Sequence, residues 1–206
     1  MSADFASRLN EILEEADHPA LDAATVGHFE GYWKLYERWN QRINLSAIRD
    51  EEGVLRRHFS ESILAADVIP EEVKTLLDFG SGAGFPGLPI ALCRPQISVT
   101  LAESQSKKAG FLREAVRTLG LTVEVFDGRA EAIGRQFDCV TLRAVDDMER
   151  AVKEAVKLTS TWLLILTTAT DAARWQKLAS KFQWQELSPI QLGVSTVPLL
   201  GRKISA

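Results

Sequence analysis

A glycine-rich turn between a buried strand and a helix constrains this chain more than any other feature. Residues 76–89 read LLDFGSGAGFPGLP, so an apolar strand runs into a turn with four glycines. Pro86 suits the first turn of the helix that follows, because its φ is already fixed near the helical value. Glycines let the backbone approach a ligand closely, and the free N–H groups of a helix start favour an anionic or carboxylate group. The segment therefore predicts a nucleotide-type ligand site.

Strands and helices alternate along the chain after residue 73. Strand-like apolar runs lie near 74–79, 98–103, 122–126, 137–142 and 161–167. Helical patterns lie near 86–93, 106–118, 147–157 and 171–180. This alternation predicts an α/β fold with a mostly parallel, Rossmann-like sheet and right-handed crossovers. The tail, 182–204, has no helical period and is expected to add a closing antiparallel pair at the edge.

The first 70 residues show helical periodicity and no convincing strand. Trp33, Tyr36 and Trp39 recur at helical spacing after a candidate cap at Asp22, and they fit a helix core better than a base-stacking platform. A further amphipathic stretch covers 52–66. We therefore expect a helical cap over 1–70 and an α/β domain over 71–206.

Length and composition exclude several classes of protein. The chain has 206 residues, a formal net charge of -4 and two cysteines. Its longest apolar run, 162–166, is far shorter than the ~20 residues of a membrane span, and its start lacks the features of a secretory signal. We expect a cytoplasmic protein without a membrane partner, monomeric by default. Cys93 and Cys139 are isolated from each other and from histidines, which predicts buried thiols and no metal site.

Two acidic residues at strand ends narrow the choice of ligand. Asp78 precedes the glycines in the form D-x-G-x-G-x-G, which resembles motif I of class I S-adenosylmethionine methyltransferases. Glu103 ends the next strand, where an acid can accept hydrogen bonds from two ribose hydroxyls. Residues 82–87 also satisfy the dinucleotide pattern G-x-G-x-x-G, so an NAD-dependent oxidoreductase stays an alternative. In the simplest interpretation, Asp78 caps a helix and Glu103 is a solvated strand end.

A closer resemblance extends from residue 44 to residue 144. Its motifs are NLSAIRD at 44–50, Arg57-His58 with Ser62, DFGSGAGFPGLPIAL at 78–92, ESQSKKAGFL at 103–112, Arg129-Ala130-Glu131 and Arg143-Ala144. Together they resemble the RsmG family, formerly GidB, whose bacterial members methylate N7 of one guanine in the decoding-region loop of 16S rRNA. The resemblance implies an S-adenosyl-L-methionine-dependent enzyme whose partner is 16S rRNA or the small ribosomal subunit.

The resemblance also implies roles for residues at matching positions. The expected cofactor-binding residues are Asp78, Gly80, Ser81, Gly82, Gly84, Phe85, Glu103, Ala130, Glu131 and Arg143. The expected RNA-facing residues are Asn44, Arg49, Arg57, His58, Lys107 and Lys108. Arg143 is expected to be exposed at a strand end and to align the reactants, because that position faces the ligand crevice of an α/β sheet. No general base is expected, since guanine N7 carries an accessible lone pair.

Several of these residues keep simpler interpretations. His58 has the spacing of a helix packing residue, and Lys107 and Lys108 fit a solvated basic face. Residues 105–117 nevertheless hold four bases against one acid, so an anionic partner is expected to meet this segment. Thr167-Thr168-Ala169 stands where the family usually has a Lys-Gly pair, and Glu61 replaces a usual Asp. The first departure leaves a non-catalytic RNA-binding relative as an alternative.

Overall fold

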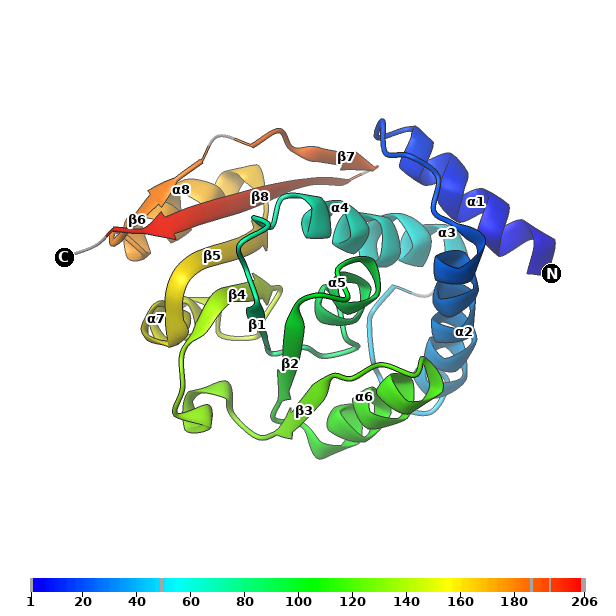
Figure 1. Ribbon diagram of the computed structural model, residues 1–206, viewed down its shortest axis with the longest axis horizontal. Helices are drawn as coiled ribbons and strands as arrows, with labels where there is room; N and C mark the ends of the chain where they lie inside the picture. Colours follow the sequence, from blue (N-terminus) through cyan, green and yellow to red (C-terminus); the bar gives the residue numbers. More distant parts are fainter. Residues whose placement is uncertain (1, 49, 186, 193, 205–206) are drawn as a thin grey trace.

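The centre of the fold is a parallel sheet. A computed structural model describes residues 2–48, 50–185, 187–192 and 194–204. Its parallel strands are β1 (Thr75–Phe79), β2 (Ser98–Glu103), β3 (Glu124–Asp127), β4 (Phe137–Arg143) and β5 (Thr159–Thr167). They run in the order β3-β2-β1-β4-β5 (Figure 1), so the order reverses between β1 and β4. The predicted α/β fold is confirmed.

The antiparallel edge is larger than the predicted pair. It consists of β6 (Phe182–Trp184), β7 (Ile190–Leu192) and β8 (Val194–Lys203). β8 pairs antiparallel with β5 and with β6, and β7 folds back onto the start of β8. The predicted antiparallel edge is confirmed, but it holds three strands instead of one pair, because β8, at ten residues, is long enough to pair with three neighbours.

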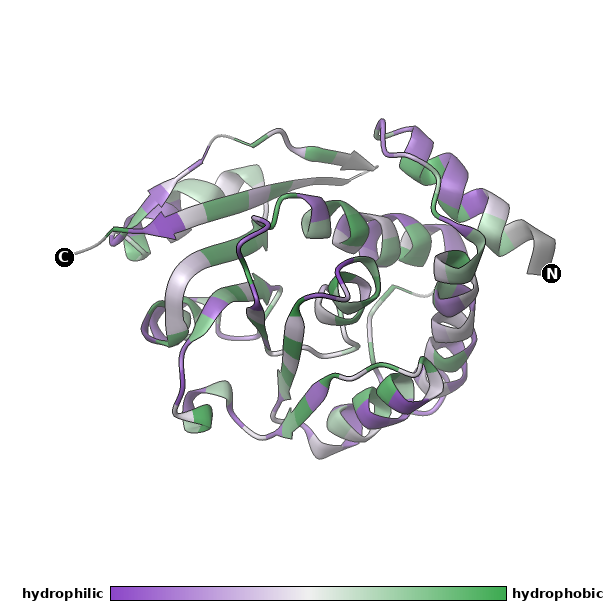
Figure 2. Cartoon of the chain, in the orientation of Figure 1, coloured by the Kyte–Doolittle hydropathy of each residue, from purple (hydrophilic) through white to green (hydrophobic). Residues whose placement is uncertain are grey.

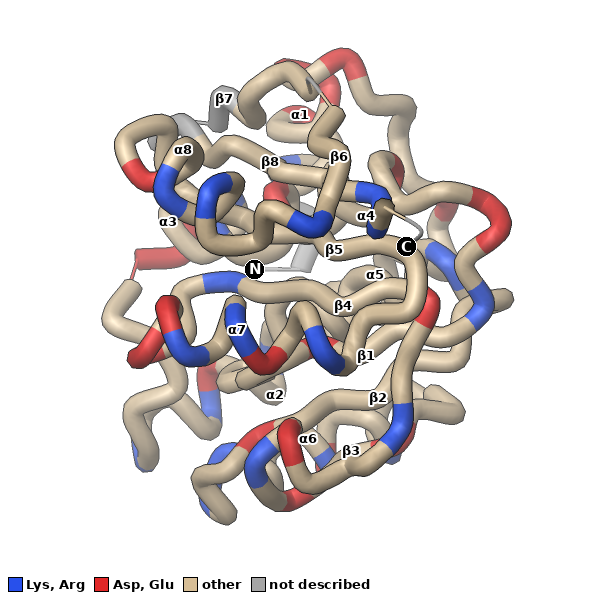
Figure 3. The backbone as a smooth tube through the Cα atoms, turned by 90° about the vertical axis from the view of Figure 1, so that its left-hand side faces the viewer, with Lys and Arg blue, Asp and Glu red and all other residues tan. Residues whose placement is uncertain are grey.

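Helices cover both faces of the sheet. The crossovers contain α5 (Gly87–Cys93), α6 (Ser106–Thr118), a 3₁₀ turn (Ala130–Ile133), α7 (Met148–Leu158) and α8 (Ala169–Leu178). Their hydropathy alternates along each ribbon (Figure 2), because each helix buries one stripe against the sheet. Acidic and basic residues are mixed along α6 and α7 (Figure 3). Of the bases of α6, Arg113 is paired with Asp127, whereas the acidic Glu114 pairs with Arg38 outside the helix.

Alternate residues of each strand enter two different cores. Leu76, Leu101 and Leu164 pack in the cluster that contains the N-terminal helices, α5 and α6. Leu77 and Leu163, their neighbours along the strands, pack in the cluster that contains α7 and α8. This follows from the two-residue period of a strand, and it explains why the strands are nearly continuous apolar runs.

The N-terminal segment consists of α1 (Ser2–Glu14), α2 (Ala23–Asn40), α3 (Glu51–Val54), a π-helical turn (Leu55–Ser60) and α4 (Glu61–Asp67). Asp22 caps α2 by accepting hydrogen bonds from the backbone of Ala24 and Thr25. Tyr36 is buried, and Trp33 and Trp39 are partly buried against the same apolar cluster. That cluster continues into the sheet, so apolar packing crosses the predicted boundary at residue 70. The boundary itself stays a prediction.

No helix in the described part of the chain is both long enough and apolar enough to cross a lipid bilayer.

Candidate cofactor and substrate cavity

The main cavity opens at the carboxyl ends of the strands, where the sheet order reverses between β1 and β4. This is the position at which open α/β sheets bind ligands. The cavity has a volume of about 980 Å³. Its walls come from the glycine turn, the ends of β2 and β4, residues 128–131, residues 166–168 and the N-terminal segment 45–48. Sequence segments that lie far apart therefore meet at one site.

The glycine turn brings bare backbone to the cavity wall. Gly80, Gly82 and Gly84 have φ values of +73°, +57° and +90°, which residues with a Cβ rarely adopt. The backbone N–H groups of Gly80 and Ser81 donate to Ala102 O at 3.0 and 2.9 Å, which fixes the turn against β2. Gly80, Ser81, Gly82 and Phe85 line the cavity, whereas Gly84 lies outside the lining and shapes the turn.

Asp78 lies beneath the turn and outside the cavity lining. Its carboxylate accepts hydrogen bonds from the backbone N–H of Gly87 at 3.2 Å and from Thr141 Oγ1 at 2.9 Å. Only 1% of the residue is exposed, and this burial raises its pKa to about 6. The expectation of direct ligand contact needs correction, because the carboxylate is buried and lies outside the cavity lining. Asp78 therefore caps the start of α5, as the simplest interpretation of the sequence proposes.

Asp78→Asn is expected to change how the free energy of unfolding depends on pH. Because the folded-state pKa lies above the unfolded value near 3.9, the folded protein binds the extra proton. This proton binding stabilises the folded state fully below about pH 4, and the stabilisation is lost as pH rises through about 6. Its size is roughly 3 kcal/mol. Urea unfolding at pH 4.5 and 7.5 should show a smaller difference for the variant. An equal difference in both proteins contradicts this assignment.

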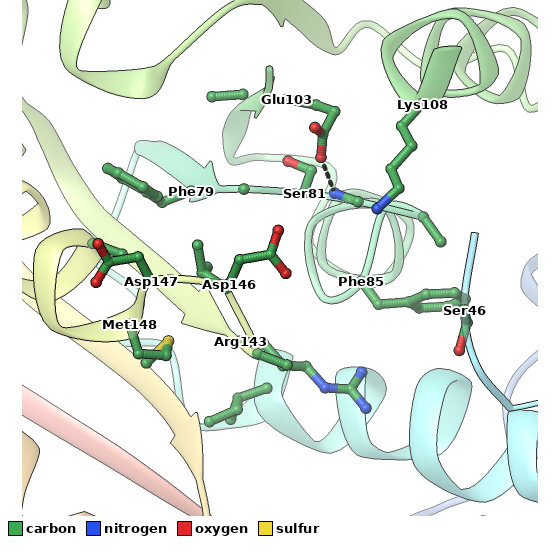
Figure 4. Close-up of a pocket in the computed structure, with 18 of the residues that line it drawn as sticks. Ser46, Phe79, Ser81, Phe85, Glu103, Lys108, Arg143, Asp146, Asp147 and Met148 are labelled. Carbon is green, nitrogen blue, oxygen red and sulfur yellow. Dashed lines mark hydrogen bonds between the residues drawn. The ribbon is translucent and has the colours of Figure 1, made fainter. Parts of the chain in front are cut away.

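Glu103 is the carboxylate that faces the cavity beside the glycine turn. One oxygen accepts from the backbone N–H of Gly82 at 2.9 Å, drawn as a dashed line in Figure 4, and the other accepts from Gln105 N at 2.7 Å. Each carboxylate oxygen can accept a second hydrogen bond. Glu103 is 6% exposed and lines the cavity. Its remaining capacity suits a pair of neighbouring hydroxyl groups.

Arg143 lines the cavity, but its guanidinium is held inside the protein. Its Nη2 donates to Glu61 Oε2 at 3.0 Å, to His58 Nδ1 at 3.2 Å and to the backbone carbonyl of Arg57. The side chains of Arg143 and Glu61 are 13% and 2% exposed. The expectation of an exposed strand-end arginine was therefore wrong, because the π-helical turn of the N-terminal segment covers the end of β4.

Burial and charge act in opposite directions on this pair. Burial lowers the pKa of Arg143 and raises that of Glu61, while each residue's opposite charge counteracts the effect. Thr196, on β8, donates its hydroxyl to Glu61 Oε1 at 2.8 Å. The network thus joins β4, the π-helical turn and β8 at one wall of the cavity.

His58 is a neutral member of the same wall. Burial lowers its pKa to about 3, and the nearby Arg143 acts in the same direction. Its Nδ1 lies 3.2 Å from Arg143 Nη2 and 3.3 Å from the carbonyl oxygen of Arg57, and its Nε2 shares a hydrogen bond with Ser46 Oγ at 2.7 Å. The ring stacks on Phe85 with 4.9 Å between centroids. His58 therefore holds residues 45–48 in place and has no ring nitrogen left to act as a base.

The remaining predicted residues divide between the cavity and its surroundings. Ala130 and Glu131 line the cavity, with Glu131 paired to Arg150 at 2.6 Å. Arg57 and Lys108 also line it, whereas Lys107 is exposed outside and Asn44 lies outside the lining. Arg49 lies outside the described residues.

Sequence reasoning missed several residues of the cavity wall, among them Ser46, Thr196 on β8 and Asp146 after β4. The charged run that follows β4 was a usable signal for Asp146. Nothing in the sequence could place Thr196 beside Glu61, since 135 positions separate the two residues.

The fold and the cavity define a class of protein. Solved structures with this fold include magnesium protoporphyrin IX methyltransferase from Synechocystis PCC 6803 with bound SAM (TM-score 0.59, 13% identity, covering 89% of this chain and 98% of that one). Another is M. jannaschii TYW2 in complex with AdoMet (TM-score 0.58, 14% identity, covering 75% and 78%). The chain has the fold of the S-adenosylmethionine-dependent methyltransferases.

The family is shown by a match over residues 26–198 to the model of GidB, described as rRNA small subunit methyltransferase G. The chain belongs to this family. Relatives called ribosomal RNA small subunit methyltransferase G include those of Roseiflexus sp. strain RS-1, 44% identical over 135 residues, and Roseiflexus castenholzii, 41% identical over 145 residues. These matches cover 62% and 67% of this chain, but only 58% and 62% of the relatives.

Proposed function

We propose that this protein transfers a methyl group from S-adenosylmethionine to N7 of a guanine in 16S rRNA within the small ribosomal subunit. The family match supports the reaction class and the RNA substrate. The observation that carries the proposal is the cavity at the β1/β4 switch point, where Glu103 and the glycine turn share one wall. The choice of the guanine, its N7 atom and the small subunit as substrate belongs to the proposal.

The described residues fit the cofactor. Glu103 has two free acceptor positions for the ribose hydroxyls, and the backbone of Gly80 and Gly82 can approach the ligand without a Cβ in the way. Ala130 is buried in the wall beyond Glu103, where it can border the adenine. When bound, S-adenosylmethionine supplies an electrophilic methyl group on its sulfonium.

The protein's own contribution is to bind, orient and exclude water. N7 needs no deprotonation, so a neutral His58 without a free ring nitrogen is consistent with the reaction. The Arg143 network fixes the wall opposite the glycine turn, which keeps the reacting groups in one geometry. Bases at the rim, Arg57 and Lys108 among them, are placed to contact phosphates and to position the RNA.

The proposal is tested by calorimetry and by methyl transfer to purified small subunits. The parent should bind S-adenosylmethionine and not NAD, and it should transfer labelled methyl groups to 16S rRNA. Glu103→Ala should weaken cofactor binding roughly 10- to 100-fold, because hydrogen bonds to a charged group are lost. Glu103→Gln, which keeps one acceptor oxygen, should be intermediate. Binding of NAD alone contradicts the proposal, and binding without transfer supports the non-catalytic alternative.

The two neighbouring lysines are expected to differ in RNA binding. Lys108 is half-buried in the cavity wall, whereas Lys107 is exposed outside it. Lys108→Ala should weaken binding of 16S rRNA and reduce the slope of log affinity against log salt by about 1, since one phosphate contact is lost. Lys107→Ala is the matched control. Equal slopes for the parent and Lys108→Ala mean that Lys108 is solvated and makes no contact with an RNA phosphate.

A further inference from the structure

The cavity contains one acidic side chain whose function the structure does not otherwise explain. Among the described residues, six carboxylates line it, and five of them have partners within the protein. Glu61 pairs with Arg143, Glu103 accepts from Gly82 and Gln105, Glu131 pairs with Arg150, Asp147 caps α7 at Arg150 N, and Asp171 accepts from Thr168 Oγ1. Asp146 has no hydrogen-bond or ion-pair partner among the residues that the structure describes.

The backbone after β4 directs Asp146 into the cavity. Ala144 has a φ of +49°, a left-handed conformation that a non-glycine residue rarely adopts. After this bend Val145 packs over Gly80, where an added Cβ would lie 3.1 Å from Val145 Cγ2. The next side chain, Asp146, points into the space beside Ser81 and Phe85, and Lys108 points toward the same space from the opposite side (Figure 4).

A free carboxylate in this place repels a bound phosphate and can accept hydrogen bonds, so a ligand group beside it is expected to be a donor. Guanine offers two adjacent donors, N1–H and the N2 amino group, which match the two oxygens of a carboxylate. Adenine presents an unprotonated N1 at the same edge and so does not match. Because RNA bases are commonly read at this edge when they are unstacked, a carboxylate can select guanine directly.

Asp146 is more exposed than the part of the cavity wall that we assign to the cofactor, which places it on the substrate side. The wall assigned to the cofactor is buried, with Ser81 2%, Glu103 6% and Ala130 4% exposed. Asp146 is exposed, on the open side from which a base attached to a polymer must enter. We propose that Asp146 determines guanine specificity by accepting hydrogen bonds from N1–H and the N2 amino group of the target base. This inference rests on the proposed function.

The test compares guanosine with inosine, which keeps N7 and N1–H but lacks the 2-amino group. Small subunits are reconstituted on 16S rRNA with either nucleoside at the methylated position. The parent should prefer guanosine roughly 10- to 100-fold in kcat/KM, as expected for one hydrogen bond to a charged acceptor. Asp146→Asn should lose most of this preference, because its amide presents a donor to a donor. Asp147→Asn, which can still cap α7, should keep it.

Three outcomes overturn the proposal in distinguishable ways. An unchanged preference in Asp146→Asn removes the residue from guanine recognition. Weaker binding of S-adenosylmethionine by Asp146→Asn, measured by calorimetry, assigns the carboxylate to the ammonium group of the cofactor instead. Absence of methyl transfer by the parent itself overturns the proposed function, and the present inference with it.

Discussion

Arg143→Ala is expected to lower the free energy of unfolding by about 3 to 5 kcal/mol, because it leaves the buried carboxylate of Glu61 without its partner. For a chain of this size that corresponds to a fall in melting temperature on the order of 10 °C. Methyl transfer should fall as well, since Arg143 also holds His58 and the carbonyl of Arg57 at the cavity wall.

The loss of stability in this variant should depend on pH. Without Arg143, the effect of burial on Glu61 is opposed only by Thr196 and Arg57, so its folded-state pKa lies still further above the unfolded value. The variant is therefore expected to be closest to the parent in acid and to lose stability as pH rises through that pKa. Thermal melts at pH 5 and 8 measure this difference. The double variant with Glu61→Gln should recover part of the loss. A melting temperature equal to that of the parent contradicts the buried pair.

Phe59→Ala is expected to destabilise the whole molecule by about 3 to 5 kcal/mol. Phe59 is fully buried in the π-helical turn, with ring centroids 5.8 Å from Phe5, 5.2 Å from Tyr32 and 5.2 Å from Phe85. These rings belong to α1, α2 and the glycine turn. Removing the ring opens a cavity where the N-terminal helices meet the ligand site.

The unfolding of this variant also tests whether the helical cap and the α/β domain unfold together. If the shared core couples the two parts, helix loss by circular dichroism and the intrinsic fluorescence, to which tryptophans of both parts contribute, should follow one transition. Ile204→Ala, at a side chain 58% exposed, is the control and should stay within about 0.5 kcal/mol of the parent. Two separate transitions mean that the cap unfolds independently.

The sheet and its crossovers were predictable because their signals are local. Apolar runs bounded by glycine and polar residues located the five parallel strands, and α6 begins and ends at the predicted residues 106 and 118. The glycine turn and Glu103 were predictable for the same reason, since each follows directly from a strand end. The extent of β8 was not, because its pairing with three neighbours depends on long-range contacts.

The environment of the charged residues could not be read from the sequence. Asp78 and Arg143 both occupy strand ends that commonly face a ligand, yet both are neutralised or bonded inside the protein. Asp78 is enclosed by Thr141 and the start of α5. Arg143 is enclosed because the N-terminal segment folds over β4 and delivers Glu61 to it. The sequence indicates which strand end carries a side chain, whereas the packing of elements that are distant in the sequence determines its interaction partners.

The most direct test of the proposed function is mass mapping of 16S rRNA from cells with and without this gene. We expect one N7-methylguanosine that is present in the parent cells, absent in the deletion, and restored by the purified protein with S-adenosylmethionine. Identical 16S rRNA methylation in both cell lines, with no transfer by the protein to small subunits from the deletion cells, contradicts it.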